Sequence, residues 1–284
     1  MITVNNLPDL RQQIADWKQQ GLRVAFVPTM GNLHDGHLSL LERGRQLCDR
    51  TVVSIFVNPI QFGKGEDYEK YPSTLEADRQ KLESCGLDLL FTPNLKELYP
   101  GGMDVDTRVN VPELSTILCG KFRPDHFSGV ATVVTKLLIN VTANVALFGE
   151  KDFQQLLIIR RLVSELCIPT DIIGMPIIRE TDGLAMSSRN AYLTATQRQL
   201  APEIYRTLQK AAEKIQNQSN ADFASIEIEC MQKLELAGFR PEYVSVRRTS
   251  DLGAPGTNDR ELSILVAAWL GTARLIDNIK VVTH

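Results

Sequence analysis

The amino-acid sequence predicts an α/β protein in which a doubly wound parallel sheet is followed by a smaller α+β domain. As far as Arg189, short apolar runs alternate with amphipathic helical segments, which is the order expected of a parallel sheet covered by helices. Beyond Arg189 the order changes, because two polar helical segments precede three strand-like runs. This change predicts two domains, over residues 1–177 and 178–284.

The elements of the first domain follow from apolar spacing and capping residues. A first helix is expected where three apolar residues recur at helical spacing: Leu10, Ile14 and Trp17, after Pro8 and before Gly21. A second capping signal, the capping box at 73–76, predicts a helix that ends near Gly86. The remaining expected helices are 37–47, 128–141 and 152–166, and the expected strands are 23–27, 51–57, 87–92, 144–148 and 170–178.

Two longer stretches complete the expected organisation. Residues 99–127 mix glycine, proline and polar residues and predict a long irregular loop, which in a compact domain usually covers something functional. The second domain is expected to be joined near residues 177–190. Its expected helices are about 194–217 and 221–237, and its expected strands are 243–247, 262–269 and 274–276.

Composition and charge restrict the classes of function. The 284 residues are 43% hydrophobic and 23% charged, with a formal net charge of -3, which is an ordinary globular composition. No basic block is present, so nucleic acid is not an expected partner. Five widely spaced cysteines, an odd number, suit reduced thiols. With no leader-like start and no apolar run of bilayer length, we expect a cytoplasmic protein that does not bind a membrane.

Two histidines, His34 and His37, lie where the first expected strand gives way to a helix. A helix N-terminus offers free backbone N–H groups and a dipole that favours anions, so phosphate is the expected ligand. The same spacing also occurs by chance at surfaces and in half of a zinc site. Zinc would need further ligands, and no cysteine pair has the two-residue spacing of a metal knuckle.

Further polar clusters follow other expected strands, and the carboxyl ends of parallel strands share one edge of a sheet. Lys151 supplies a point charge, Arg189 a planar set of donors, and Ser187 and Ser188 hydroxyl groups. This set suits a triphosphate and a pyrophosphate leaving group, and none of these side chains is an obvious nucleophile. Each also has an ordinary structural explanation, Lys151 at a solvated helix start and the serines in a domain linker.

Four strings of the sequence resemble the pantothenate synthetase family, the pantoate:beta-alanine ligases of the nucleotidylyltransferase superfamily. They keep the family order and span nearly the whole chain, at residues 28–37, 54–62, 148–155 and 182–190. Four long strings together are far more specific than any one motif. The resemblance implies a Rossmann-like fold of the nucleotidylyltransferase type, with the two histidines as a HIGH-like signature and 186–189 as the counterpart of a mobile KMSKS-like loop.

The resemblance also implies a reaction. ATP and (R)-pantoate form an enzyme-bound pantoyl adenylate with release of pyrophosphate, and the amine of beta-alanine then attacks it, giving pantothenate and AMP. Mg²⁺ accompanies the ATP, and the enzyme is a homodimer. A carboxylate attacks phosphorus unaided, so the enzyme supplies positioning and electrostatics. Because the adenylate must be shielded from water, we expect the loop at 182–190 and the second domain to act as a lid.

Residue roles carry over by position. The implied catalytic residues are His37, as proton donor, with His34 and Lys151. ATP binding is implied for Met30, His34, His37, Gly149, Lys151, Asp152, Ile178, Met186, Ser187, Ser188 and Arg189. Pantoate binding is implied for Gln61 and Gln155, beta-alanine binding for Gln61, and a place in the crevice for Asn58, Arg123 and His126. No protein ligand of magnesium is assigned.

The chain departs from the family pattern at few positions. Ile60 and Ile178 replace other apolar residues, Cys119 stands where acidic residues are common, and Asp125 stands where a small or neutral residue is usual. A carboxylate at 125, beside anionic substrates, is expected to weaken their binding somewhat. Two alternatives remain open. One is an adenylyltransferase acting on a phosphorylated acceptor, which would need cations rather than glutamines facing that acceptor; the other is a nucleotide-binding regulator without chemistry.

Overall fold

The computed structural model describes residues 1–63, 66–72, 74–103, 105–218 and 221–283, and the chain forms two compact units. Unit 1 comprises Met1–Glu150 and Gln155–Pro176, and unit 2 comprises Lys151–Gln154 and Ile177–His284. The chain therefore passes into unit 2 for four residues, 151–154, before it returns to complete unit 1. The sequence does not predict this short excursion.

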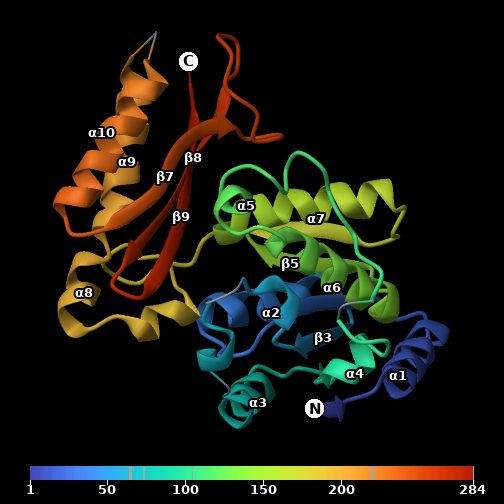
Figure 1. The fold of residues 1–284 in the computed structure, drawn as a ribbon. Coiled ribbons are helices and arrows are strands. Elements are labelled where there is room, and N and C mark those ends of the chain that lie inside the picture. Colours follow the sequence, from blue (N-terminus) through green and yellow to red (C-terminus); the bar gives the residue numbers. More distant parts are fainter. Residues whose placement is uncertain (64–65, 73, 104, 219–220, 284) are drawn as a thin grey trace. The chain divides into compact units, whose positions relative to one another are not determined.

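Unit 1 is built on a six-stranded parallel sheet (Figure 1). In spatial order the strands are β1 (Ile2–Val4), β4 (Leu89–Phe91), β3 (Arg50–Ile55), β2 (Val24–Thr29), β5 (Val145–Gly149) and β6 (Asp171–Met175). The doubly wound parallel sheet expected from the sequence is confirmed. Strand β1 was not expected, and β6 ends before Pro176, so Ile178 lies outside the sheet.

Helices bury both faces of this sheet. On one face, α2 (Asp35–Leu47) and α3 (Leu75–Ser84) contribute Leu41 and Leu82 to a core that includes Val53 of β3. Successive strand residues point to opposite faces, and Phe26, whose neighbours in β2 belong to that core, is also fully buried. Helix α6 (His126–Val141) contacts β2 and packs against α1 (Leu7–Gln19). Helix α7 (Phe153–Glu165) connects β5 to β6.

The stretch expected to be one long loop contains short structure. Helix α5 (Cys119–Phe122) lies within it, and α4 (Leu95–Leu98) and single-turn helices at Pro59–Gln61 and Tyr68–Lys70 lie before it. Ser73 of the expected capping box lies outside the described residues, and α3 begins at Leu75 with Thr74 as its N-cap.

Unit 2 contains a three-stranded antiparallel sheet, in the order β7 (Arg240–Arg248), β8 (Glu261–Leu270), β9 (Ala273–Val282). Helices α9 (Glu203–Asn217) and α10 (Phe223–Leu236) lie side by side along it (Figure 1). The helix expected over 194–217 is divided, because α8 (Ala195–Leu200) ends before Pro202, which has no N–H group to continue the hydrogen bonds of the helix.

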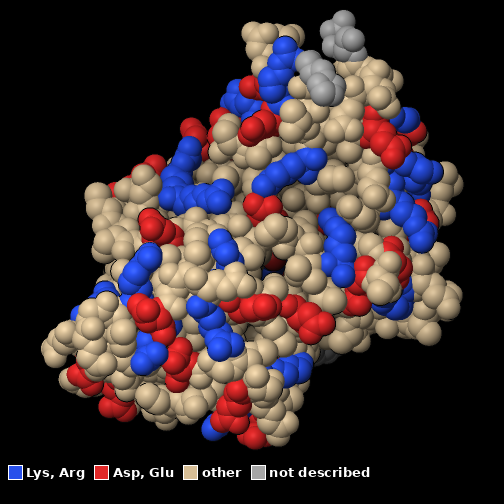
Figure 2. All heavy atoms as spheres, turned by 180° about the vertical axis from the view of Figure 1, so that it is seen from behind, with Lys and Arg blue, Asp and Glu red and all other residues tan. Residues whose placement is uncertain are grey.

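On the face drawn in Figure 2, basic and acidic side chains are interspersed. Among the described residues, no helix combines the length and the apolar character needed to cross a membrane.

Candidate active site

The sheet order places the candidate residues of unit 1 at one edge. Strand β2 lies between β3 and β5. The chain adds β3 on one side of β2 and later adds β5 on its other side, which creates a topological switch point between β2 and β5. In such sheets ligands bind beyond the carboxyl ends of the strands at this point. His34 and His37 follow β2, Asn58 and Gln61 follow β3, and Gly149 ends β5.

The loop between β2 and the histidines is held by α3. Asp78, 1% exposed, accepts hydrogen bonds from the backbone N–H groups of Asn32 and Leu33, both at 2.8 Å. Lys81 donates to the Leu33 carbonyl at 2.6 Å. The loop takes a left-handed path, with φ of 81° at Gly31 and 50° at Asn32, and Asn tolerates this conformation better than most residues. One acidic and one basic side chain of α3 thus fix the loop that leads into α2.

His34 is the N-cap of α2, and His37 lies in its first turn. Their ring centroids are 4.1 Å apart, and His37 Nδ1 accepts a long hydrogen bond, 3.4 Å, from the backbone N–H of His34. Both imidazoles therefore lie at a helix N-terminus, whose dipole favours a bound anion. Asp35, exposed in the same turn, offsets part of that positive potential.

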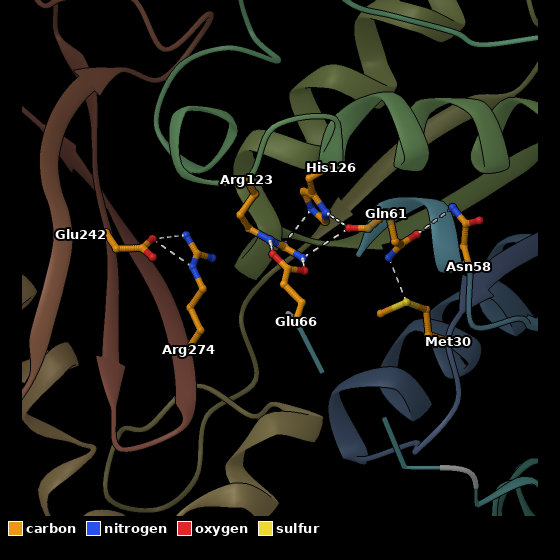
Figure 3. A network of polar contacts seen from close by, with 8 residues as sticks. All are labelled: Met30, Asn58, Gln61, Glu66, Arg123, His126, Glu242 and Arg274. Atoms are coloured by element: carbon orange, nitrogen blue, oxygen red, sulfur yellow. Dashed lines mark hydrogen bonds and ion pairs between the residues drawn. The ribbon is translucent and has the colours of Figure 1, made fainter. Parts of the chain in front are cut away.

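Asn58 and Gln61 form the amide pair of unit 1 (Figure 3). Asn58 is 1% and Gln61 8% exposed. Asn58 Nδ2 donates to the Gly129 carbonyl at 3.1 Å and to Gln61 Oε1 at 3.3 Å. Asn58 Oδ1 accepts from the Tyr99 hydroxyl at 3.0 Å, and Gln61 Nε2 lies 2.9 Å from Met30 Sδ. The oxygen of Gln61 is therefore used inside the protein, and its NH₂ group faces the Met30 side.

A glycine allows α6 to approach the amide pair. A Cβ on Gly129 would lie 2.7 Å from Gln61 N and 2.8 Å from the Ile60 carbonyl carbon. Atoms that close cannot be accommodated without moving the backbone of residues 60–61. Gly129 therefore sets the distance between α6 and the turn that carries Gln61.

Glu66, Arg123 and His126 form a cluster against the backbone of Gln61 (Figure 3). Arg123 holds Glu66 in a two-bond ion pair, with Nε–Oε1 at 2.6 Å and Nη2–Oε2 at 2.5 Å. Burial raises the pKa of Glu66, but the hydrogen bond and charge of Arg123 outweigh it, so the pKa lies below its ordinary value. His126 Nδ1 donates to the Gln61 carbonyl at 2.7 Å, which leaves Nε2 to accept from Arg123 at 3.1 Å. This assigns His126 the neutral Nδ1–H form.

In unit 2, strand β9 holds the segment that contains Lys151. Asn278 Nδ2 donates to the Lys151 carbonyl at 3.1 Å, and Lys280 Nζ lies 5.4 Å from the ring centroid of Phe153. The Lys151 ammonium is 3.4 Å from Asp152 Oδ2. The Glu242–Arg274 ion pair, also drawn in Figure 3, joins β7 to β9 in the same sheet.

The same strand anchors the segment expected to resemble a mobile loop. Residues 178–186 form a small hairpin, in which Met186 N–H donates to the Ile178 carbonyl at 3.0 Å and Gly183 turns with φ of 96°. Arg179 at its base forms a two-bond ion pair with Asp277, at 2.7 and 2.9 Å, and its guanidinium lies 3.5 Å from the Tyr205 ring centroid. Asp277 and Asn278 are adjacent, so β9 holds both this hairpin and Lys151.

Ser187 and the residues after it lead from the hairpin into a short 3₁₀ helix, Ser188–Tyr192. Ser187 Oγ accepts from the backbone N–H of Arg189 at 3.3 Å. Met186, Ser187, Ser188 and Arg189 are all half-buried. The predicted ATP residues are therefore divided: Lys151, Asp152, Ile178 and Met186–Arg189 belong to unit 2, while Met30, His34, His37 and Gly149 belong to unit 1. Gln155, in the first turn of α7, also belongs to unit 1.

Comparison with known proteins decides the family of this chain. A sequence profile described as pantoate-beta-alanine ligase matches residues 2–280. The pantothenate synthetase of Hahella chejuensis is 52% identical over 281 residues, covering 99% of both chains. The chain belongs to the pantoate-beta-alanine ligase family. A second family member, the pantothenate synthetase of Pseudomonas fluorescens, is also 52% identical, over 98% of this chain and 97% of its own.

Solved structures of pantoate-beta-alanine ligases have the same fold. The crystal structure of pantothenate synthetase from Thermus thermophilus matches with a TM-score of 0.89 and 43% identity, covering 98% of this chain and 99% of that chain. The Francisella tularensis pantoate-beta-alanine ligase matches with a TM-score of 0.83 and 38% identity, covering 98% of this chain and 97% of that chain. That enzyme was crystallised in complex with beta-gamma ATP and beta-alanine. The Rossmann-like fold expected from the resemblance is confirmed.

The structure adds residues to this ligase's candidate site that sequence reasoning missed. Tyr99 and Glu66 contact candidate residues, and Asp78 holds the loop that leads to His34, but nothing local in the sequence marks these three. Gly129 carried a signal, since a glycine inside an apolar helical run often marks a close approach. Asp125 has a backbone explanation: it is exposed and left-handed, with φ of 65°, at the N-cap of α6.

Proposed function

We propose that the protein catalyses the ATP-dependent condensation of (R)-pantoate with beta-alanine to pantothenate, AMP and pyrophosphate, through a pantoyl adenylate. One arrangement carries the proposal: the buried amide of Gln61 presents its NH₂ group beside Met30, four residues before the histidine pair. A hydroxy acid can thus be bound by neutral donors directly beside a helix N-terminus suited to phosphate. Membership of the ligase family supplies the reaction.

In the first step the pantoate carboxylate attacks the α-phosphorus of ATP, and pyrophosphate leaves. The proposed role of His37 and His34 is to donate hydrogen bonds to phosphate oxygens as their negative charge grows, with Lys151 adding a point charge. In the second step the amine of beta-alanine attacks the acyl carbon and AMP leaves. No covalent bond to the protein is needed, so aligning two anions and neutralising the leaving group account for the rate.

The remaining residues are proposed to bind and orient the substrates. Gly149, Asp152, Ile178 and Met186–Arg189 complete the ATP site, Gln61 and Gln155 hold pantoate, and Asn58, Arg123 and His126 line the crevice. Gly149 suits such a role, because a Cβ there would meet no protein atom within 4 Å. That open space at the end of β5 leaves room for a ligand next to the backbone.

The site favours a carboxylic acid over the alternative of a phosphorylated acceptor. The side chains that follow β3 are amides, and the nearby cation, Arg123, already holds Glu66 in a two-bond ion pair. A phosphorylated acceptor carries about two charges and would require cations available to it. Identification of AMP rather than a dinucleotide as the product distinguishes the two functions.

We propose that Mg²⁺ enters the site bound to ATP. Within the described ranges, no group of three or more His, Cys, Asp or Glu side chains is placed to hold a metal ion. Mg²⁺ typically keeps several waters and binds through substrate phosphates, which fits its arrival as a complex with ATP.

We further propose that residues 182–190 and unit 2 act as a lid that protects the adenylate from water. The double variant Ser187→Ala, Ser188→Ala is then expected to release more AMP per pantothenate, because water reaches the adenylate more often. Single-turnover assays with ATP and pantoate but no amine measure this hydrolysis. Unchanged hydrolysis would argue against the lid.

The decisive experiment is incubation with ATP, Mg²⁺, pantoate and beta-alanine, with identification of every product by mass spectrometry. Pantothenate, AMP and pyrophosphate in equal amounts are expected, and pyrophosphate should form from ATP and pantoate alone. Nucleotide binding without pyrophosphate release would instead favour the regulator. We also propose a cytoplasmic homodimer, for which light scattering during size exclusion provides the test of assembly.

A further inference from the structure

Residues with no assigned role contact the amide pair of unit 1 through Asn58. Tyr99 is 2% exposed, and its hydroxyl donates to Asn58 Oδ1 at 3.0 Å. Lys136 Nζ lies 4.2 Å from the centroid of the Tyr99 ring. The same ammonium donates to the Leu98 carbonyl at 2.6 Å and to Asp106 at 2.7 Å. A chain of contacts thus runs from Asp106 and Lys136 through Tyr99 to the amide pair.

At one end of this series of contacts, a backbone carbonyl fixes which side-chain atoms donate hydrogen bonds and which accept them. The Gly129 carbonyl only accepts, so the side-chain atom of Asn58 that lies 3.1 Å from it must be the NH₂ nitrogen. Asn58 Oδ1 then faces Tyr99, which must donate its single hydroxyl proton. The second N–H of Asn58 faces Gln61 Oε1, so Gln61 must turn its own NH₂ group away from Asn58.

At the other end of this series of contacts, the surroundings of Tyr99 keep its hydroxyl protonated, so that it can donate a hydrogen bond. Burial, the largest effect, raises the pKa of Tyr99 to about 12, so the hydroxyl keeps its proton throughout the neutral range. The ammonium over the ring face restrains the ring and draws electron density from it, which makes the hydroxyl a better donor. Asp106 and the Leu98 carbonyl hold the ammonium in place.

We propose that Tyr99 and Lys136 are positioning residues for the acid substrate, because they hold Asn58 in the orientation that makes Gln61 present NH₂ rather than oxygen to it. This inference rests on the proposed function. Met30 Sδ, a weak acceptor, is the present neighbour of that NH₂ group. A carboxylate or hydroxyl oxygen of pantoate is a stronger acceptor and is expected to take the same donor.

Two variants test the inference: Tyr99→Phe removes only the hydroxyl, and Lys136→Met removes the ammonium over the ring together with its bonds to Leu98 and Asp106. Each is expected to raise the KM for pantoate about tenfold, the loss expected for one hydrogen bond to a neutral partner, with the KM for ATP changed less than about twofold. Matched controls in the same unit are Tyr68→Phe, on an exposed ring, and Lys18→Met, whose ammonium donates to Thr142 at the surface. Both controls should behave as wild type.

Steady-state kinetics with each substrate varied, together with thermal unfolding, separate the outcomes. An unchanged KM for pantoate in both variants would overturn the inference. So would equal losses for ATP and pantoate, or loss of folding in both variants, since either result indicates a structural role alone. A wild-type protein that makes no pantothenate would instead contradict the proposed function, which keeps the two failures distinct.

Discussion

The amide pair of unit 1 and the 178–192 segment of unit 2 hold their candidate residues in different ways. Asn58 and Gln61 are almost fully buried and bonded on several sides. In the 178–192 segment, which forms a hairpin and a 3₁₀ helix, Met186–Arg189 are half-buried and Ile178 is exposed. That segment is anchored at its base, through Arg179 and Asp277.

This difference is consistent with the two proposed roles, a preformed site for the acid and a lid. Binding an acid in one orientation requires side chains whose rotamers are fixed before the ligand arrives. A lid over a triphosphate must instead be able to move, and because Leu184 and Ala185 of the hairpin are buried, the proposed lid is the hairpin together with unit 2. On this view the buried anchor of unit 2 should matter for stability, and the contacts around the amide pair should matter for substrate use.

The largest expected effect is on the anchor. Asp277→Ala leaves Arg179 without its buried partner, and breaking such a pair typically costs about 3–5 kcal/mol. We expect a lower melting temperature and faster hydrogen exchange in β9 and the hairpin, measured by mass spectrometry. Asp182→Ala is the matched control, because it breaks an Arg–Asp pair in the same unit whose side chains are about one-third exposed; its expected cost is at most about 1 kcal/mol. An equal loss of stability in both variants would show that the buried pair anchors unit 2 no more strongly than the exposed pair.

His37→Ala is expected to have the next largest effect, on rate rather than on stability. If His37 donates to growing negative charge, its loss should raise the barrier to adenylation by roughly 2–4 kcal/mol. Pantoate-dependent pyrophosphate release measures this step. Wild-type kinetics in a variant with unchanged thermal unfolding would exclude His37 from catalysis.

The sequence was sufficient for most of the fold because its signals are local. Alternating apolar runs and caps predicted β2–β6 and their helices, and Pro8 and Gly21 bracketed α1. Strand β1 was missed, since three residues carry no period and gain their structure by pairing with β4. The helix break at Pro202 was missed for the opposite reason, because the apolar pattern continues on both sides of that proline.

The site was predictable only where motifs are contiguous. The strings containing Met30 and Gln61 marked the two strand ends, and the structure brings these residues into contact. Tyr99 lies 41 residues from Asn58, and Arg179 lies 98 residues from Asp277. Such pairings depend on the packed fold, so no local pattern announces them.

Two glycines provide a smaller test of how the preformed site is built. Gly129→Ala forces a methyl group against the backbone of residues 60–61, and overpacking of this kind costs about 1–3 kcal/mol. We expect both a lower melting temperature and a higher KM for pantoate. Gly149→Ala is the comparison, because its methyl group meets no protein atom within 4 Å. Gly149→Ala should leave stability unchanged and raise the KM for ATP. A loss of stability in this variant would contradict the conclusion that the space beside Gly149 is open.

Glu66→Gln should produce the smallest effect, visible mainly as a change in pH dependence. The Glu66 pKa is lower in the folded protein than its ordinary value of about 4.3, so its pairing with Arg123 stabilises the fold above that value. This contribution is lost as the pH falls through the lower, folded pKa. The free energy of unfolding of the wild type should therefore exceed that of the variant by about 1 kcal/mol or less near pH 7, and this gap should close in acid, below the lowered pKa, as measured by urea unfolding of the protein. A difference in stability that stays constant with pH would mean that packing, rather than the charge of the pair with Arg123, accounts for the contribution of Glu66.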